Sequence, residues 1–146
     1  MYVDDIVIAS NDYRTIEKLK TFLDSQFKLK DLRQLKYFLG LEVARSRKRI
    51  FVSQRHYALQ LLSDFGFLGC KPISTPMEAN INLSQNDGEL LEDPILYRRL
   101  IGKLLYLRIT RLDLENLVNC LNQYLASPRS THLQGVHRIL QYSRVQ

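Results

Sequence analysis

The sequence has few of the residues that bind metal ions or form disulfides, with two cysteines and three histidines among its 146 residues. Cys70 and Cys120 are isolated and belong to no cysteine–histidine cluster, so we expect no structural zinc and a reducing environment. His56 also stands alone. His132 and His137 are five residues apart, which places them on different faces of a helix and not at the spacing of a metal site.

Long apolar stretches are missing as well. No run approaches the roughly 20 residues that span a bilayer. Asp4 and Asp5 stand where a secretory signal would carry basic and then apolar residues. We therefore expect an intracellular protein without a membrane segment. Hydrophobic residues make up 45% of the chain and charged residues 25%, a composition typical of a globular domain.

Positive charge is in excess, because 21 Lys and Arg residues against 15 Asp and Glu residues give a net charge of +6. Such an excess favours association with nucleic acid or another anionic surface. Many basic proteins bind neither, so composition alone does not decide between binding and solubility.

The first half of the sequence predicts a mixture of strands and one helix. Residues 6–9 are apolar and mainly β-branched, which predicts a buried strand. Asn11 or Asp12 is suited to cap a helix whose apolar positions recur every three or four residues. Residues 35–43 and 50–53 predict the two strands of a β-hairpin with a strongly basic tip at residues 44–49. Within the first of these strands, Gly40 suggests a bulge or a close backbone approach.

The second half predicts helices. One is expected over residues 55–65, where Gly66 would end it. An irregular segment follows over residues 70–93, interrupted by Pro, Asn and Gly, and we interpret it as a linker. Three further helices are then predicted, over residues 94–107, over residues 113–125, and from Ser130 or Thr131 to the end of the chain.

Asp4 and Asp5 are the first candidates for chemistry. Adjacent carboxylates repel each other, and burial makes the repulsion worse. A water-exposed turn relieves the repulsion, and so does a bound Mg²⁺ ion, which prefers carboxylate and phosphate oxygens. In phosphoryl transfer, two such ions activate the attacking oxygen and stabilise the leaving one. Taken alone, the solvated turn is the more common explanation.

The sequence Tyr2-Val3-Asp4-Asp5, followed by an apolar segment, resembles the catalytic turn of reverse transcriptases. The resemblance implies that Asp4 is the principal Mg²⁺ ligand of the turn and that Asp5 assists. It also implies that Tyr2 and Val3 lie beneath the primer terminus.

Residues 38–43, the basic tip and residues 50–54 resemble the hairpin that holds the primer strand in retroviral and retrotransposon polymerases, most closely in copia-type elements. The resemblance implies contacts to primer phosphates by the hairpin backbone and its basic side chains. The residues concerned are Gly40, Arg45, Arg47, Lys48 and Arg49. The alternative is an ordinary surface hairpin with solvated arginines.

Residues 97–107, continuing to residues 110–114, resemble the first thumb helix of these polymerases and its connection to the next helix. Arg99 and Lys103 are four residues apart and would share a face suited to phosphates. Gly102 in a helix interior costs about 1 kcal/mol relative to alanine. That cost suggests close packing, or close passage of a nucleic-acid backbone, and packing is the more common reason.

These matches together imply an α+β fold and an RNA or DNA template-primer as partner. We expect a partial polymerase palm over residues 1–70, a linker over residues 71–93 and thumb-like helices over residues 94–146. Residues 69–77 resemble the stretch that links palm and thumb in copia-type polymerases.

The sequence also departs from the family pattern. Reverse transcriptases need a third carboxylate on an upstream palm strand, and no aspartate after the turn matches it. We would expect glycine in place of Arg33 and proline in place of Leu112. We therefore expect a reverse-transcriptase part that is inactive alone. The alternatives are a basic nucleic-acid-binding module without catalysis, a non-functional pseudogene product, and one piece of an incompletely assembled gene model.

Overall fold

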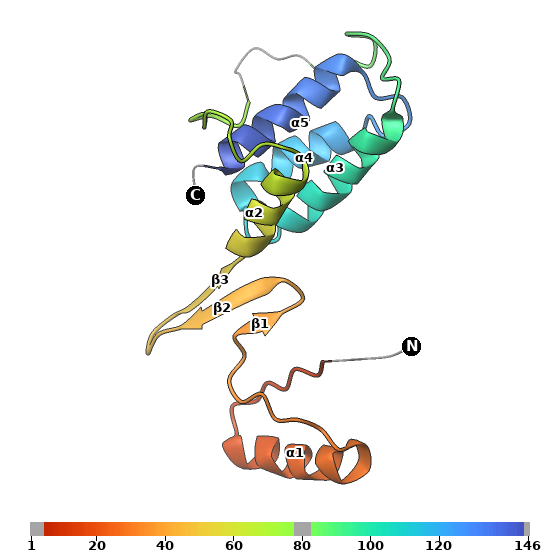
Figure 1. Ribbon diagram of the computed structural model, residues 1–146. Helices are drawn as coiled ribbons and strands as arrows, with labels where there is room; N and C mark the ends of the chain where they lie inside the picture. The colour runs from red at the N-terminus through yellow and green to blue at the C-terminus, as the bar shows by residue number, and fades with distance from the viewer. Residues whose placement is uncertain (1–4, 78–82, 145–146) are drawn as a thin grey trace. The chain divides into compact units, whose positions relative to one another are not determined.

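The computed structural model describes residues 5–77 and 83–144. Tyr2, Val3 and Asp4 of the predicted site therefore lie outside the described residues. The chain contains two compact units, Met1–Val52 and Ser53–Gln146. Helices and short strands are both present, which confirms the expected α+β class (Figure 1).

The first unit contains helix α1 (Tyr13–Phe27) and a sheet of strand order β1-β2-β3 (Figure 1). The strands are β1 (Tyr37–Phe38), β2 (Leu41–Arg45) and β3 (Ile50–Ser53), the last of which ends just past the unit boundary. Asp12 caps α1 as predicted, because its carboxylate accepts hydrogen bonds from the Arg14 amide at 2.9 Å and from the Thr15 hydroxyl at 2.7 Å.

The prediction of a single strand over residues 35–43 is wrong. Two strands stand there, β1 and β2, paired antiparallel with Phe38 opposite Leu41. Leu39 and Gly40 form the two-residue turn between them, with φ angles of 49° and 77°. Positive φ at both central positions is typical of the tight hairpin turn whose twist matches the strands. Gly40 therefore serves a turn and not a bulge.

The strand predicted over residues 6–9 is also wrong, since residues 5–10 have no regular structure. A strand needs a neighbour for its backbone hydrogen bonds, and no described strand pairs with this segment. Ile6 and Val7 are 54% and 45% exposed. No described residue of the first unit is buried, so its apolar side chains form no core among themselves.

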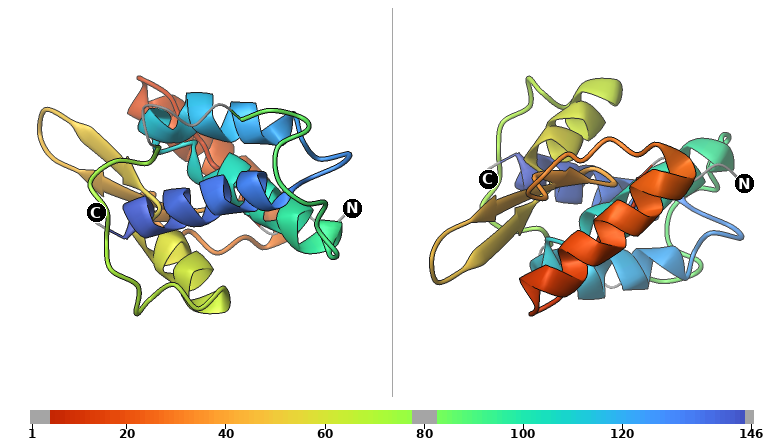
Figure 2. Two further views of the ribbon diagram at one scale, coloured as in Figure 1. Left: turned by 90° about the horizontal axis from the view of Figure 1, so that it is seen from above. Right: turned by 90° about the horizontal axis from the view of Figure 1, so that it is seen from below.

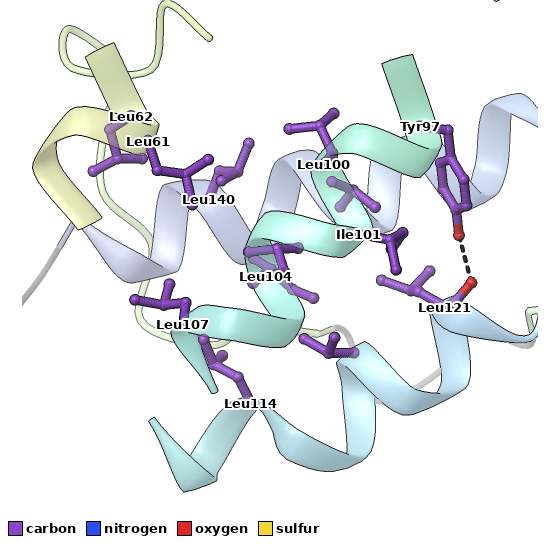
Figure 3. Packing of buried hydrophobic residues seen from close by; sticks show 13 residues of the cluster. Leu61, Leu62, Tyr97, Leu100, Ile101, Leu104, Leu107, Leu114, Leu121 and Leu140 are labelled. Atoms are coloured by element: carbon purple, nitrogen blue, oxygen red, sulfur yellow. Dashed lines mark hydrogen bonds between the residues drawn. The ribbon is translucent and has the colours of Figure 1, made fainter. Parts of the chain in front are cut away.

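The second unit is helical (Figure 2), and it contains the hydrophobic core. It comprises α2 (Arg55–Asp64), α3 (Pro94–Leu107), the 3₁₀ turn η1 (Leu112–Leu114), α4 (Glu115–Asn122) and α5 (Ser130–Ser143). Helices α3, α4 and α5 contact one another in pairs, and α2 packs on α3. Buried leucines, isoleucines and valines from all four helices meet between them (Figure 3). Tyr97 is fully buried there, and its hydroxyl donates to the Leu121 carbonyl at 2.7 Å.

The helix ends follow local rules in two places and depart from them in one. Gly66 ends α2 as predicted: its φ is 74°, and the Gly66 and Phe67 amides donate back to Ser63 and Leu62. Helix α3 spans the predicted residues 94–107 with Pro94 in its first turn, and the Asp93 carboxylate caps it by accepting from the Ile95 and Leu96 amides. The helix predicted over residues 113–125 instead begins as η1, and α4 ends at Asn122.

The segment predicted as a linker is held against the helical unit where it is described. His132 on α5 is fully buried, and its Nδ1 accepts the Arg129 amide hydrogen at 3.0 Å. Its Nε2 therefore carries the proton and donates to the Ser84 carbonyl at 3.0 Å. The ring also stacks on Tyr124, whose hydroxyl donates to the Leu83 carbonyl. The assignment of palm, linker and thumb stays a prediction.

Candidate nucleic-acid interface

The tip of the β2–β3 hairpin is a four-residue turn over residues 46–49. The Ser46 amide donates to the Arg49 carbonyl at 2.8 Å, and the Ser46 hydroxyl oxygen accepts the Arg49 amide hydrogen at 3.0 Å. Backbone and serine side chain together close the turn, so Arg47 and Lys48 occupy its two central positions. The predicted hairpin with a basic tip is confirmed as a structure.

The basic side chains of this tip are exposed and unpaired. Arg45, Arg47, Lys48 and Arg49 are all exposed, and none of them forms an ion pair within the part of the chain that the structure describes. We call these four residues the basic tip. An external anion that binds them displaces no carboxylate of the described residues. Lys20 on α1 differs, because it already pairs with Glu17 and Asp31.

Exposed apolar side chains adjoin the basic tip. Ile50 and Phe51 are 62% and 55% exposed, although an apolar strand sequence favours burial. An exposed aromatic ring beside cations can stack on a nucleic-acid base. The sequence pattern gave no sign of this exposure, since burial depends on which surface covers the strand.

Two of the three basic residues of α3, Arg99 and Lys103, lie on one face, and each contacts the end of α2. The Lys103 ammonium nitrogen is 3.5 Å from a carboxylate oxygen of Asp64. The Arg99 guanidinium carbon is 5.7 Å from the centre of the Phe65 ring, a cation–π contact. We call Arg99 and Lys103 the α3 basic pair. Asp64 and Phe65 were missed by the sequence analysis, because no local pattern links residues so far apart along the chain.

Gly102 lies on the exposed side of α3. A Cβ atom built at this position meets no heavy atom within 4 Å. Close packing is therefore the wrong explanation for this glycine within the described chain. The surface beside the α3 basic pair is open to a backbone approaching from outside.

Among the carboxylates in and after the predicted catalytic turn, Asp12 and Asp31 have other roles. Asp5 is exposed, Asp12 caps α1, and Asp31 accepts from the Arg33 amide at 2.7 Å and pairs with Lys20. The Arg33 amide and Lys20 hold the pKa of Asp31 below its ordinary value. Residues 5–77 and 83–144 contain no group of three acidic, histidine or cysteine side chains suited to a metal ion.

The chain matches known proteins over nearly its full length. The family model for reverse transcriptase (RNA-dependent DNA polymerase) matches residues 1–79. The chain belongs to the reverse transcriptase family. It is 41% identical over 142 residues to the retrovirus-related Pol polyprotein from transposon RE1 of Arabidopsis thaliana, covering 97% of this chain and 10% of that protein. The corresponding polyprotein from transposon TNT 1-94 of Nicotiana tabacum is 32% identical, with 99% of this chain and 12% of that protein covered.

The family match and these transposon polyproteins together confirm the resemblance to copia-type retrotransposon polymerases. An uncharacterized mitochondrial protein of Arabidopsis thaliana is also similar, at 35% identity over 97% of this chain and 59% of its own length. The chain thus spans about a tenth of the transposon polyproteins it matches. No solved structure gives a significant match. Within the described residues, no helix has the length and apolar character needed to cross a bilayer.

Proposed function

We propose that this chain supplies a template-primer-binding part of a reverse transcriptase and does not transfer nucleotides by itself. The observation that carries the proposal is the basic tip, where four cationic side chains are exposed and unpaired at one end of a hairpin. In the family, a divalent metal ion and a nucleic-acid template belong to the complete enzyme.

The physical basis is attraction between these cations and phosphates. Each phosphate neutralised by Lys or Arg releases condensed counterions, which favours binding and makes it depend on salt. The Arg side chains of the tip can form two parallel hydrogen bonds to one phosphate, which fixes its orientation. Such contacts hold a strand in register without reading its sequence, as a primer-holding element requires.

The α3 basic pair supplies a second set of phosphate contacts in this proposal. Arg99 is exposed, Lys103 is partly exposed, and Gly102 between them leaves room for a sugar-phosphate backbone. We assign the basic tip the larger share of the affinity, because its cations have no ion-pair partner among residues 5–77 and 83–144 to give up.

The proposed lack of activity follows from the carboxylates. Nucleotide transfer with two metal ions needs several carboxylate oxygens around one point. Asp4 and Asp5 are adjacent and supply one side of such a cradle, while Asp12 and Asp31 are engaged in a helix cap and an ion pair. The 146-residue protein should not extend a primer on an RNA template with Mg²⁺ or Mn²⁺. Extension that Asp4→Asn abolishes would show that the chain is an enzyme by itself.

Binding is tested with two variants of equal charge. In the first, the basic tip carries four changes to glutamine. In the second, Arg14, Lys18, Lys28 and Lys30, which are exposed and have no ion pair among the described residues, carry the same change. The tip variant should lose at least tenfold in affinity for an RNA–DNA primer-template at low salt, and the control variant much less. Equal losses would mean that net charge, and not the hairpin, governs binding.

A further inference from the structure

The α3 basic pair is held differently from the basic tip, because the end of α2 supplies a partner for each cation. Lys103 pairs with Asp64, and their side chains are 33% and 42% exposed. Arg99 lies over the ring of Phe65. Any phosphate that binds Lys103 therefore meets a carboxylate already in place.

The local structure of α2 does not account for Asp64. It is the last residue of the helix, where the backbone dipole presents its negative end and disfavours a carboxylate. Burial is the main cause that raises the pKa of the Tyr57 hydroxyl, and the charges of Tyr106 and Asp64 raise it further. The contact that gives this carboxylate a favourable environment is the one with Lys103.

We propose that Asp64 competes with nucleic-acid phosphate for Lys103 and so weakens the grip of the α3 basic pair. This inference rests on the proposed function. Solvent screens an ion pair as exposed as this one, so its net free energy is small and a phosphate can displace the carboxylate. On binding, the Lys103 ammonium moves from Asp64 to a phosphate oxygen, and Asp64 returns to water.

Phe65 has the complementary role of keeping Arg99 in position. A cation–π contact holds a guanidinium near an aromatic ring without using its N–H groups, which stay available for hydrogen bonds to an anion. In the α3 basic pair, Phe65 thus positions Arg99 for phosphate, while Asp64 holds Lys103 back from it. The α3 face is tuned to bind phosphate less tightly than its charge alone would allow.

The test compares Asp64→Asn with a control, Glu115→Gln. The control removes the same negative charge at an exposed residue that has no ion pair among the described residues. Affinity for an RNA–DNA duplex is measured by fluorescence anisotropy on the full chain. Asp64→Asn should bind about two- to fivefold tighter than wild type, the factor by which an exposed ion pair holds its lysine. Glu115→Gln should stay close to wild type. Both comparisons are repeated in a Lys103→Met background, where the gain from Asp64→Asn should disappear.

Three results would overturn the inference. One is an Asp64→Asn affinity equal to that of Glu115→Gln or weaker than wild type. Another is a gain that persists in the Lys103→Met background. In both cases the proposed function stands if the basic-tip variant still loses affinity. The third is the absence of duplex binding by the wild-type chain, which would overturn the proposed function together with this inference.

Discussion

The Arg111 guanidinium and the Asp113 carboxylate meet through two parallel hydrogen bonds, 2.9 Å from Nε to Oδ1 and 2.8 Å from Nη2 to Oδ2. The guanidinium also lies over the ring of Tyr142, 5.2 Å from its centre. This contact ties the turn between α3 and α4 to α5.

The paired carboxylate predicts a pH dependence. Hydrogen bonding to Arg111 holds the pKa of Asp113 below its ordinary value of 3.8. A carboxyl group with a lowered pKa in the folded state stabilises the fold above its ordinary pKa, and that stabilisation is lost as the pH falls through the folded value. Asp113→Asn should therefore lower the free energy of unfolding by roughly 0.5–1 kcal/mol at pH 7. In urea unfolding, the difference from wild type should shrink below pH 3.8, and a constant difference would contradict the assignment.

Gly102 gives opposite predictions for stability and for binding. Gly102→Ala should raise the free energy of unfolding by about 1 kcal/mol, because alanine favours the helix and its methyl group meets no neighbour. The same methyl group should weaken duplex binding if a backbone passes close to α3. Thermal unfolding and anisotropy on the same preparation measure both effects. Lower stability would show that the site is not open.

Gln54 gives a prediction for the helical unit. Its buried side chain donates to the Tyr106 carbonyl at 3.2 Å and accepts from the Thr110 hydroxyl at 2.9 Å. Gln54→Leu should lower the free energy of unfolding by about 1–3 kcal/mol, since it leaves these groups without their partner. The matched control is Gln60→Leu on the exposed side of α2, which should change stability little. Equal effects would mean that the two hydrogen bonds contribute nothing.

The φ of Arg33, a position where we expected glycine, is 64°. This left-handed conformation costs a non-glycine residue about 1–2 kcal/mol in the folded state. Glycine removes this strain, but its greater freedom in the unfolded chain offsets roughly 0.5–1 kcal/mol of the gain. Arg33→Gly should therefore stabilise this part of the first unit by roughly 0.5–1 kcal/mol. Slower hydrogen exchange over residues 28–36 is the readout. Lys30, an exposed neighbour, does not have a positive φ, so Lys30→Gly relieves no strain there and should speed exchange instead.

Some elements could be predicted because their signals are local. The bounds of α3 follow from Pro94 and the apolar spacing, and the end of α2 follows from Gly66. The strand over residues 6–9 failed because a strand depends on a partner that the local sequence does not specify. The turn at Leu39 and Gly40 was missed because a leucine rarely adopts positive φ.

The same distinction applies to the candidate site. The basic tip was predictable from a charge run between two strand patterns. The contacts of Asp64 with Lys103 and of Phe65 with Arg99 were not, since they join residues of α3 to residues at the end of α2 that are far away along the chain. The openness around Gly102 likewise depends on packing in three dimensions.

The salt dependence of primer-template binding tests the central claim most directly. For the wild-type chain, log Kd should rise linearly with log salt concentration, with a slope of roughly 0.7–0.9 for each phosphate contact. The basic-tip variant should bind more weakly, with a slope lower by up to four such contacts. The control variant with changes at Arg14, Lys18, Lys28 and Lys30 should keep a slope close to that of the wild type. Identical slopes for wild type and tip variant would contradict the account, because the hairpin would then contact no phosphate.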